Sequence, residues 1–174
     1  ARSDVAMDVV PTLRTCAGHH AEAGACARCD VTTRADTSGV DPAANLTIEG
    51  DVNWVGGWGL AFGPCGGKAQ ATVGSSSKLY TRITASGEYA IELWAAPGNV
   101  VQEDAYLVSY GSGTTTKNFT LAQREYQFEA FARSSATDTN GAPALLTADA
   151  DRDAQASLQH IVLAYDPVNG RRLY

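Results

Sequence analysis

The chain has 174 residues, of which 44% are hydrophobic, and carries a formal net charge of −6 at neutral pH. This length suits one well-buried core with a small appendage, and two full domains would be crowded. The excess of carboxylates argues against nucleic acid or an anionic membrane as partner, because both are bound by basic surfaces. No apolar run approaches the roughly 18 residues of a membrane-spanning helix, so we expect no membrane insertion.

The predicted N-terminal segment, residues 1–36, shows little regular pattern. Pro11 limits any helix there to short pieces, so we expect an irregular or briefly helical segment. Its side chains could hold a metal ion such as zinc, although the loop between the two ligand pairs is shorter than in common zinc fingers. The candidate ligands are Cys16, His19 or His20, Cys26 and Cys29. A disulfide such as Cys16 to Cys29 is the alternative, and Cys65 is expected to be free or without a matched partner.

The predicted second segment, residues 37–174, consists of short strands separated by turns. Its first half is expected to contain strands at 46–49, 52–55, 59–62 and 69–73. Gly50-Asp51 and Gly56-Gly57 separate the first three strands, and Gly56-Gly57, like Gly66-Gly67 later, suits a hairpin that needs positive φ. A serine cap followed by apolar residues at helical spacing predicts a short helix at 75–84.

The stretch at 87–97 is the clearest strand of the chain. Tyr89, Ile91 and Leu93 share one face, Glu88, Glu92 and Trp94 share the other, and glycine and proline bound the run. Further strands are expected at 105–110, 118–123, 126–133, 158–165 and 171–174. The strand at 158–165 is apolar on both faces, so we expect it to lie centrally and to be covered on both sides.

These patterns predict an all-β fold, a two-sheet antiparallel β-sandwich. The last residues are entering a strand when the sequence stops, so we expect a sandwich that is incomplete at its C-terminus.

From residue 88 onward the order of segments resembles the laminin-G-like family of concanavalin A-like jelly rolls, in its bacterial variety. The segments that carry the resemblance are Tyr89-Ala90-Ile91-Glu92-Leu93-Trp94, Leu107-Val108-Ser109-Tyr110, Asn118-Phe119-Thr120-Leu121, Tyr126-Gln127-Phe128 and Leu158-Gln159-His160-Ile161-Val162-Leu163-Ala164-Tyr165-Asp166. The resemblance implies a secreted or periplasmic module of a larger multidomain chain. Such a module binds glycans or proteins, sometimes with calcium, and usually has no catalytic activity.

A second resemblance concerns Cys16-Ala17-Gly18-His19-His20. The segment is similar to the c-type haem attachment motif, with the second cysteine replaced by His19 and with His20 at the axial-ligand position. The resemblance implies either a degenerate motif without haem or an accessory segment linked to haem or a metal.

Glu88 and Glu92 lie four residues apart on one strand face, the spacing at which related glucanases place acid and nucleophile. Those enzymes also have an aspartate midway, where this chain has Ala90. Retaining glycosidases depend on closely placed carboxylates, so solvated glutamates are the preferred interpretation and a glycoside hydrolase fragment is the alternative.

Three aspartates alternate in a later loop, a pattern that suits a calcium site built from loop oxygens. They are Asp149, Asp151 and Asp153, with Asp138 and Asn140 as further candidate ligands. The pattern does not fit an EF-hand, because Ala154 and His160 occupy the positions of its glycine and glutamate. A solvated acidic turn is the alternative.

Several large aromatic residues could form a stacking platform for sugar rings. They are Trp54, Trp58, Tyr80, Trp94 and Tyr106. Aromatic rings also fill cores, and we expect most of these residues to be buried. The leading hypothesis is therefore a non-catalytic extracytoplasmic module that binds a glycan or a protein through loops of the sandwich.

Overall fold

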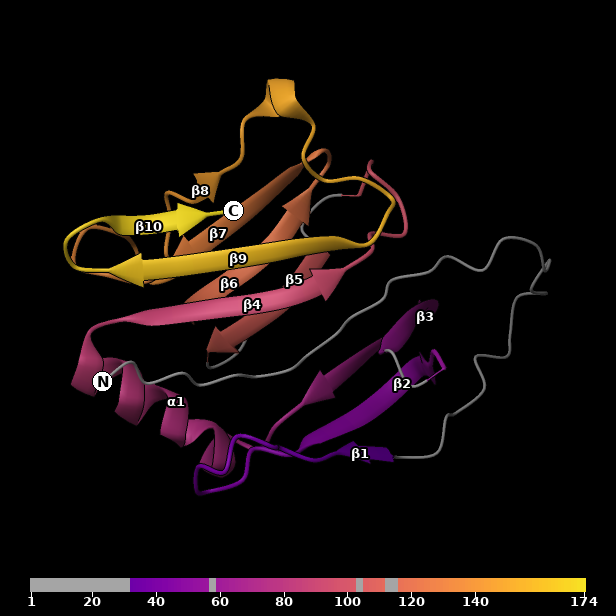
Figure 1. The fold of residues 1–174 in the computed structure, drawn as a ribbon, viewed down its shortest axis with the longest axis horizontal. Coiled ribbons are helices and arrows are strands. Elements are labelled where there is room, and N and C mark those ends of the chain that lie inside the picture. Colours follow the sequence, from indigo (N-terminus) through magenta and orange to yellow (C-terminus); the bar gives the residue numbers. More distant parts are fainter. Residues whose placement is uncertain (1–31, 57–58, 103–104, 112–115) are drawn as a thin grey trace.

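The computed structural model describes residues 32–56, 59–102, 105–111 and 116–174, and this part of the chain consists mostly of β-strands with one α-helix. Its elements are drawn in Figure 1. They are β1 (Thr32–Arg34), β2 (Leu46–Trp54), β3 (Leu60–Gln70), α1 (Val73–Ser86), β4 (Tyr89–Ala95), β5 (Ala105–Gly111), β6 (Lys117–Arg124), β7 (Gln127–Ala132), β8 (Leu145–Leu146), a 3-10 turn (Asp149–Asp151), β9 (Gln159–Asp166) and β10 (Gly170–Leu173).

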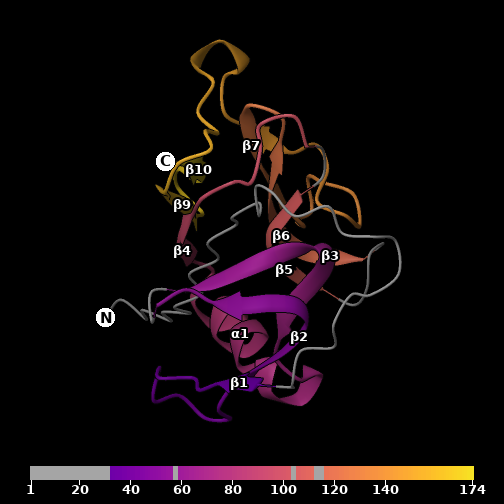
Figure 2. The same ribbon diagram turned by 90° about the vertical axis from the view of Figure 1, so that its right-hand side faces the viewer.

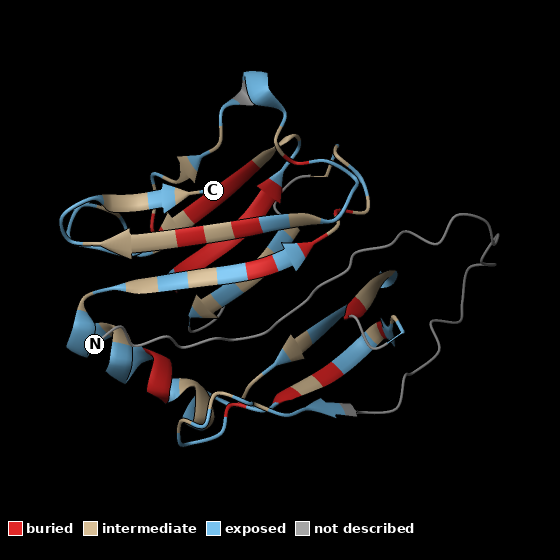
Figure 3. Cartoon of the chain, in the orientation of Figure 1, coloured by how far each residue is buried: buried red, intermediate tan, exposed pale blue. Residues whose placement is uncertain are grey.

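Two antiparallel sheets face one another and enclose the main core. One has the strand order β10-β9-β4 and the other β5-β6-β7-β8. The facing strands carry the buried residues, as Figure 3 shows for β4, β9, β6 and β7. The core side chains are Leu93, Ala95, Ile161 and Leu163 from the first sheet, Leu121, Phe128 and Ala130 from the second, and Ala154 from a loop. The predicted all-β sandwich class is confirmed.

The predicted alternation of β4 is confirmed by its pairing with β9. The register runs from Tyr89 opposite Tyr165 to Ala95 opposite Gln159. Leu93 and Ala95 are buried on the inner face, and Trp94 between them points outward. β9 is the middle strand of its sheet, as predicted, but the expectation that both of its faces are covered is wrong. Leu158 and His160, on its outer side, are exposed.

The third sheet, β1-β2-β3, has a small core of its own. That core consists of Ile48, Val52 and Leu60, with Phe62 and Ala69 packed against it. In Figure 1 this sheet lies below and to the right of the two facing sheets, and in the turned view of Figure 2 it lies with α1 in the lower half of the molecule.

The hairpin of the third sheet lies where the sequence predicts it, since β2 ends at Trp54 and β3 begins at Leu60, but the other glycine pairs differ from their predicted roles. Gly50-Asp51 is a bulge within the continuous strand β2, and Gly66-Gly67 lies within β3 opposite it. A Cβ on Gly50 would meet the Gly66 carbonyl oxygen at 2.5 Å, so glycine is required by the close approach of the two strands and not by a turn. The predicted strand at 69–73 is likewise wrong beyond Gln70, because α1 begins at Val73.

Helix α1 confirms the predicted helix and is longer than predicted at both ends. Thr72 is its N-cap, with its hydroxyl accepting the Ser75 amide N–H, and Gly87 ends it in the left-handed conformation. The predicted segment boundary at 36/37 stays a prediction. Strand β1 pairs with β2, and Asp36 forms an ion pair with Lys78 of α1. Among the described residues, α1 is too short and polar to cross a bilayer, and no other helix could do so.

Candidate functional site

The outward face of β4 and β9 holds a cluster of three side chains that contact one another. The rings of Trp94 and His160 are stacked, with centroids 4.6 Å apart and planes inclined by 17°. Nε2 of His160 lies 2.7 Å from Oε1 of Glu92, a hydrogen bond and an ion pair when the imidazole is protonated. We call these three residues the Trp94 cluster.

The cluster follows from strand register. Trp94 lies directly opposite His160 in the antiparallel pair, and Glu92 is two residues before Trp94 and therefore on the same face. The alternation of residues 87–97 predicts Glu92 and Trp94 on one face, but no sequence pattern indicates a role for His160. The missing information was the pairing of β4 with β9, which are separated by more than sixty residues in the sequence. The apolar alternation of both strands could have suggested that pairing.

Trp94 is partly open to solvent. One face of its indole packs on the imidazole, and β4 is the last strand of its sheet in the described part of the chain. The opposite face of the ring is therefore directed to the open edge of the sheet. The residue is 45% exposed.

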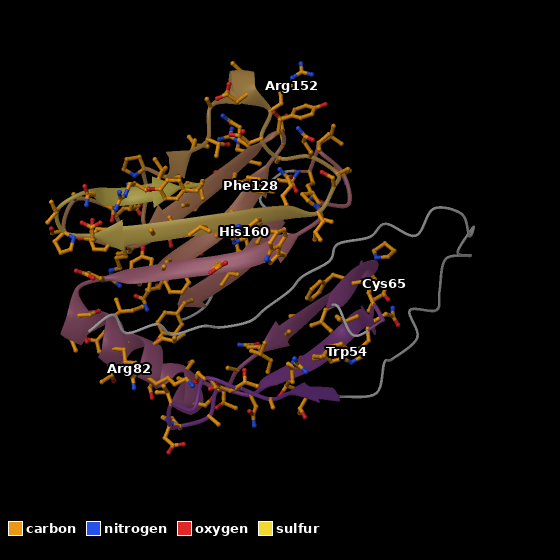
Figure 4. All side chains as sticks on the ribbon, viewed as in Figure 1. Trp54, Cys65, Arg82, Phe128, Arg152 and His160 are labelled. Atoms are coloured by element: carbon orange, nitrogen blue, oxygen red, sulfur yellow. The ribbon has the colours of Figure 1, made fainter. Side chains whose placement is uncertain are left out.

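Two further large side chains lie exposed near the cluster. Leu158 and Tyr174 are exposed large side chains, and Tyr174 pairs with Val162 across the strands. His160 lies on the side of β9 turned toward the viewer in Figure 4, whereas Phe128 lies behind it in the core. Exposed apolar patches bordered by polar groups commonly mark binding surfaces.

The charged groups of the cluster are only partly engaged. The Glu92 side chain is 66% exposed and uses Oε1 for its bond to His160. A carboxylate has two oxygens that accept hydrogen bonds, so Oε2 can accept further donors from a ligand. The cluster can thus offer a flat apolar surface and a fixed acceptor side by side.

Only two carboxylates of a glucanase-type site are present on or next to the outer face of β4. Glu88 and Glu92 are both exposed, as predicted, and Ala90 between them is exposed on the same face. Glu92 is held by His160, so the described residues place an imidazole and not a third carboxylate next to it.

The expectation that most of the aromatic candidates are buried is wrong for the described ones. Trp54, Tyr80, Trp94 and Tyr106 are all exposed. Aliphatic side chains fill the core instead, with Leu121, Ile161 and Leu163 among the largest fully buried side chains. Trp54 lies on the third sheet, far from His160, as Figure 4 shows, and Trp58 lies outside the described residues.

The aspartates predicted to bind calcium are not brought together with other ligands in the described residues. Asp149 and Asp151 lie in the 3-10 turn, and the side chain of Asp149 is not described. Asp138 accepts the amide N–H groups of Asn140 and Ala142, which lower its carboxyl pKa. Within the described ranges, no three His, Cys, Asp or Glu side chains are grouped as metal ligands would be. The calcium site stays a prediction.

The candidate zinc and haem residues Cys16, His20, Cys26 and Cys29 lie outside the described residues, as does His19. Cys65 is disulfide-bonded, so the expectation that it is free or unmatched is wrong. The glycines next to Cys65 suggest a turn with a free thiol. The disulfide could not be predicted, because connectivity cannot be deduced from sequence alone.

Comparison with known proteins gives no assignment. No protein family model matches the chain, and neither a curated protein nor a solved structure is significantly similar to it. Arguments about function therefore depend on the geometry of the chain itself.

Proposed function

We propose that the chain is a non-catalytic binding module that recognises a glycan through the outer face of β4 and β9. The observation that carries the proposal is the Trp94 cluster, in which a half-exposed indole lies beside an exposed carboxylate, both held by one histidine. The proposed ligand would bind on a face of the sheet, whereas the sequence predicts binding through loops of the sandwich.

The chemistry of the cluster suits a sugar ring. The C–H groups on one face of a pyranose pack on an aromatic ring, and the hydroxyl groups at its edge need acceptors such as Oε2 of Glu92. Because His160 fixes both side chains, little side-chain freedom remains to be lost on binding. The resemblance to laminin-G-like jelly rolls, in which glycan binding is common, supports the same proposal by analogy.

Two further features support a binding role outside the cytoplasm. Ala90 stands where a glucanase-type site would have its middle carboxylate, which favours binding over hydrolysis. The disulfide at Cys65 is of a kind that persists in oxidising compartments, which favours a secreted or periplasmic location. The module would then be part of a larger secreted chain, with the Cys16 and His20 segment as an accessory.

A pair of matched tryptophan variants tests the proposal. Trp94→Ala removes the ring at the proposed site, and Trp54→Ala removes a ring of nearly equal exposure, 46% against 45%, on the third sheet. Binding to a glycan array, followed by calorimetry on the best ligand, should weaken at least about tenfold in Trp94→Ala. Trp54→Ala should change the Kd by less than about twofold.

The opposing outcomes are distinct. Equal losses in the two variants, or no glycan bound by the wild type, would overturn the proposal, and a protein recovered through the same Trp94 face would replace it. Release of reducing sugar from a β-glucan that is abolished by Glu92→Gln would establish the hydrolase alternative.

A further inference from the structure

We infer that the glycan recognised at the Trp94 cluster carries amine groups, so that a glucosamine-type chain is preferred over neutral and acidic ones. The inference rests on the proposed function and adds the charge of the ligand to it. It comes from the distribution of charge on the outer face of β10, β9 and β4.

Alternation along the three strands assigns the charged residues of this face. They are Glu88 and Glu92 on or next to β4, His160 and Asp166 on β9, and Arg172 on β10. Three carboxylates therefore face one guanidinium and one imidazole. An acidic sugar would meet net repulsion on this face, and a cationic sugar would meet net attraction.

The positive group of β10 is paired on the same face, although the Arg172 side chain remains 44% exposed. Nη2 of Arg172 donates to Oδ2 of Asp166 at 2.7 Å. Amide groups of the following turn also hydrogen-bond to Asp166, chiefly those of Asn169, and lower its pKa, so this carboxyl remains ionised and holds the guanidinium. The charges left to meet a ligand are those of Glu88 and Glu92, with His160 beside the second.

Glu92 is the carboxylate that a ligand on Trp94 would meet first. It precedes Trp94 by two residues on the same face, and its exposed side chain keeps Oε2 for a new donor. An ammonium group at Oε2 would form a charge-assisted hydrogen bond there. A neutral hydroxyl could form only a weaker bond, and a ligand carboxylate could form none.

Three oligosaccharides of equal length test this inference against the wild type by calorimetry at one slightly acidic to neutral pH. The probes are oligomers of glucosamine, N-acetylglucosamine and glucuronic acid. Because exposed ion pairs contribute about 0.2–1 kcal/mol each, the glucosamine oligomer should bind up to about fivefold tighter than the acetylated one. The glucuronic acid oligomer should bind weakest, and added salt should weaken only the glucosamine complex appreciably.

Two variants connect the preference to Glu92. Glu92→Gln keeps the size and a hydrogen-bonding group but removes the charge, so it should weaken the glucosamine complex more than the acetylated one and thereby remove most of the preference. Glu92→Lys should move the preference toward glucuronic acid. Glu49→Gln, at an exposed glutamate of the third sheet, is the matched control and should leave the ranking unchanged.

The results separate the inference from the proposed function. Equal binding of the three oligomers, or an unchanged ranking in Glu92→Gln, would overturn the amine preference while a loss in Trp94→Ala would still support glycan binding. Failure of all three oligomers and of every neutral glycan to bind would overturn both.

Discussion

At the scale of single residues, the Asp36–Lys78 ion pair is a deeply buried charged contact. The Lys78 ammonium donates to Asp36, to the Ser38 hydroxyl at 3.0 Å and to the Val40 carbonyl at 2.9 Å. The two charged side chains are 3% and 10% exposed. All three donors of the ammonium are thus used, and the pair attaches the loop before β2 to α1.

Asp36→Asn should therefore destabilise the protein by about 3 kcal/mol, because it leaves a buried ammonium without its counter-charge. Urea unfolding followed by circular dichroism measures the loss. Glu49→Gln, which breaks the exposed pair with Lys68, should cost less than about 1 kcal/mol. Equal and small losses in the two variants would show that the Asp36–Lys78 pair adds little to stability.

The same pair predicts how stability depends on acid pH. The Lys78 ammonium beside Asp36 holds the pKa of this carboxyl well below its usual range. A carboxyl whose pKa is lower in the folded state stabilises the protein above its unfolded pKa of about 3.9, and that stability is lost as the pH falls toward the folded value. Wild type should lose stability below about pH 4, and Asp36→Asn should lose less over the same range.

Tyr89 predicts how stability depends on alkaline pH. Burial raises its pKa to about 12, an effect that the nearby Arg171 guanidinium opposes in part. Its hydroxyl is buried and has no hydrogen-bond partner among the described residues. A raised pKa stabilises the fold below the unfolded value of about 10, and this contribution is lost as the pH rises toward about 12.

Tyr89→Phe should leave stability at neutral pH unchanged or slightly higher, because the replaced hydroxyl is buried without a partner. It should also reduce the loss of stability at alkaline pH, measured by denaturant unfolding across that range. The exposed Tyr80 supplies the control, since Tyr80→Phe should alter neither. A wild-type protein that unfolds no sooner in alkali than Tyr89→Phe would contradict this account.

At the scale of elements, glycines in β2 and α1 should respond to alanine with opposite signs. Gly50 has φ +86° and faces the Gly66 carbonyl across the bulge, whereas an added Cβ on Gly74 in α1 meets nothing within 4 Å. Gly50→Ala should cost at least about 2 kcal/mol through strain and collision. Gly74→Ala should stabilise by about 0.5–1 kcal/mol through helix propensity.

Thermal and urea unfolding of the two glycine variants gives both signs in one experiment. A tolerated alanine at residue 50 would mean that β2 and β3 do not approach as closely as the bulge requires. A loss at residue 74 would mean that α1 begins later than Val73.

The elements show clearly which parts of this fold the sequence can predict. Strand β4 was predictable because Leu93 and Ala95 alternate with outward residues, and each side chain reports its own face. The bulge at Gly50 was not, because a glycine-aspartate pair is also a common turn, and only the partner strand distinguishes the two structures. Strand β8 is just two residues long and has no pattern to detect.

The candidate site shows the same limit. Alternation placed Glu92 and Trp94 on one face, but the third member of the cluster comes from β9. Its contribution depends on register between strands distant in sequence, which sequence pattern alone does not fix.

At the scale of the whole molecule, the two facing sheets explain why the aromatic candidates are outside. The inner faces are close enough to be filled by Leu121, Phe128, Ile161 and Leu163. Trp94 occupies an outward position of the alternation, so its exposure follows from the register and not from a defect of packing. The half-exposed Trp94 ring is therefore available to the ligand proposed above.

The most direct test of this account is a nuclear magnetic resonance titration of the wild type with a glucosamine oligomer, observing the indole N–H resonances of the three tryptophans. The spectra of Trp94→Ala and Trp54→Ala assign the indole resonances of these two tryptophans. The account predicts a saturable shift of the Trp94 resonance, with the Trp54 resonance unmoved. A ligand that moves Trp54 and leaves Trp94 in place would contradict it.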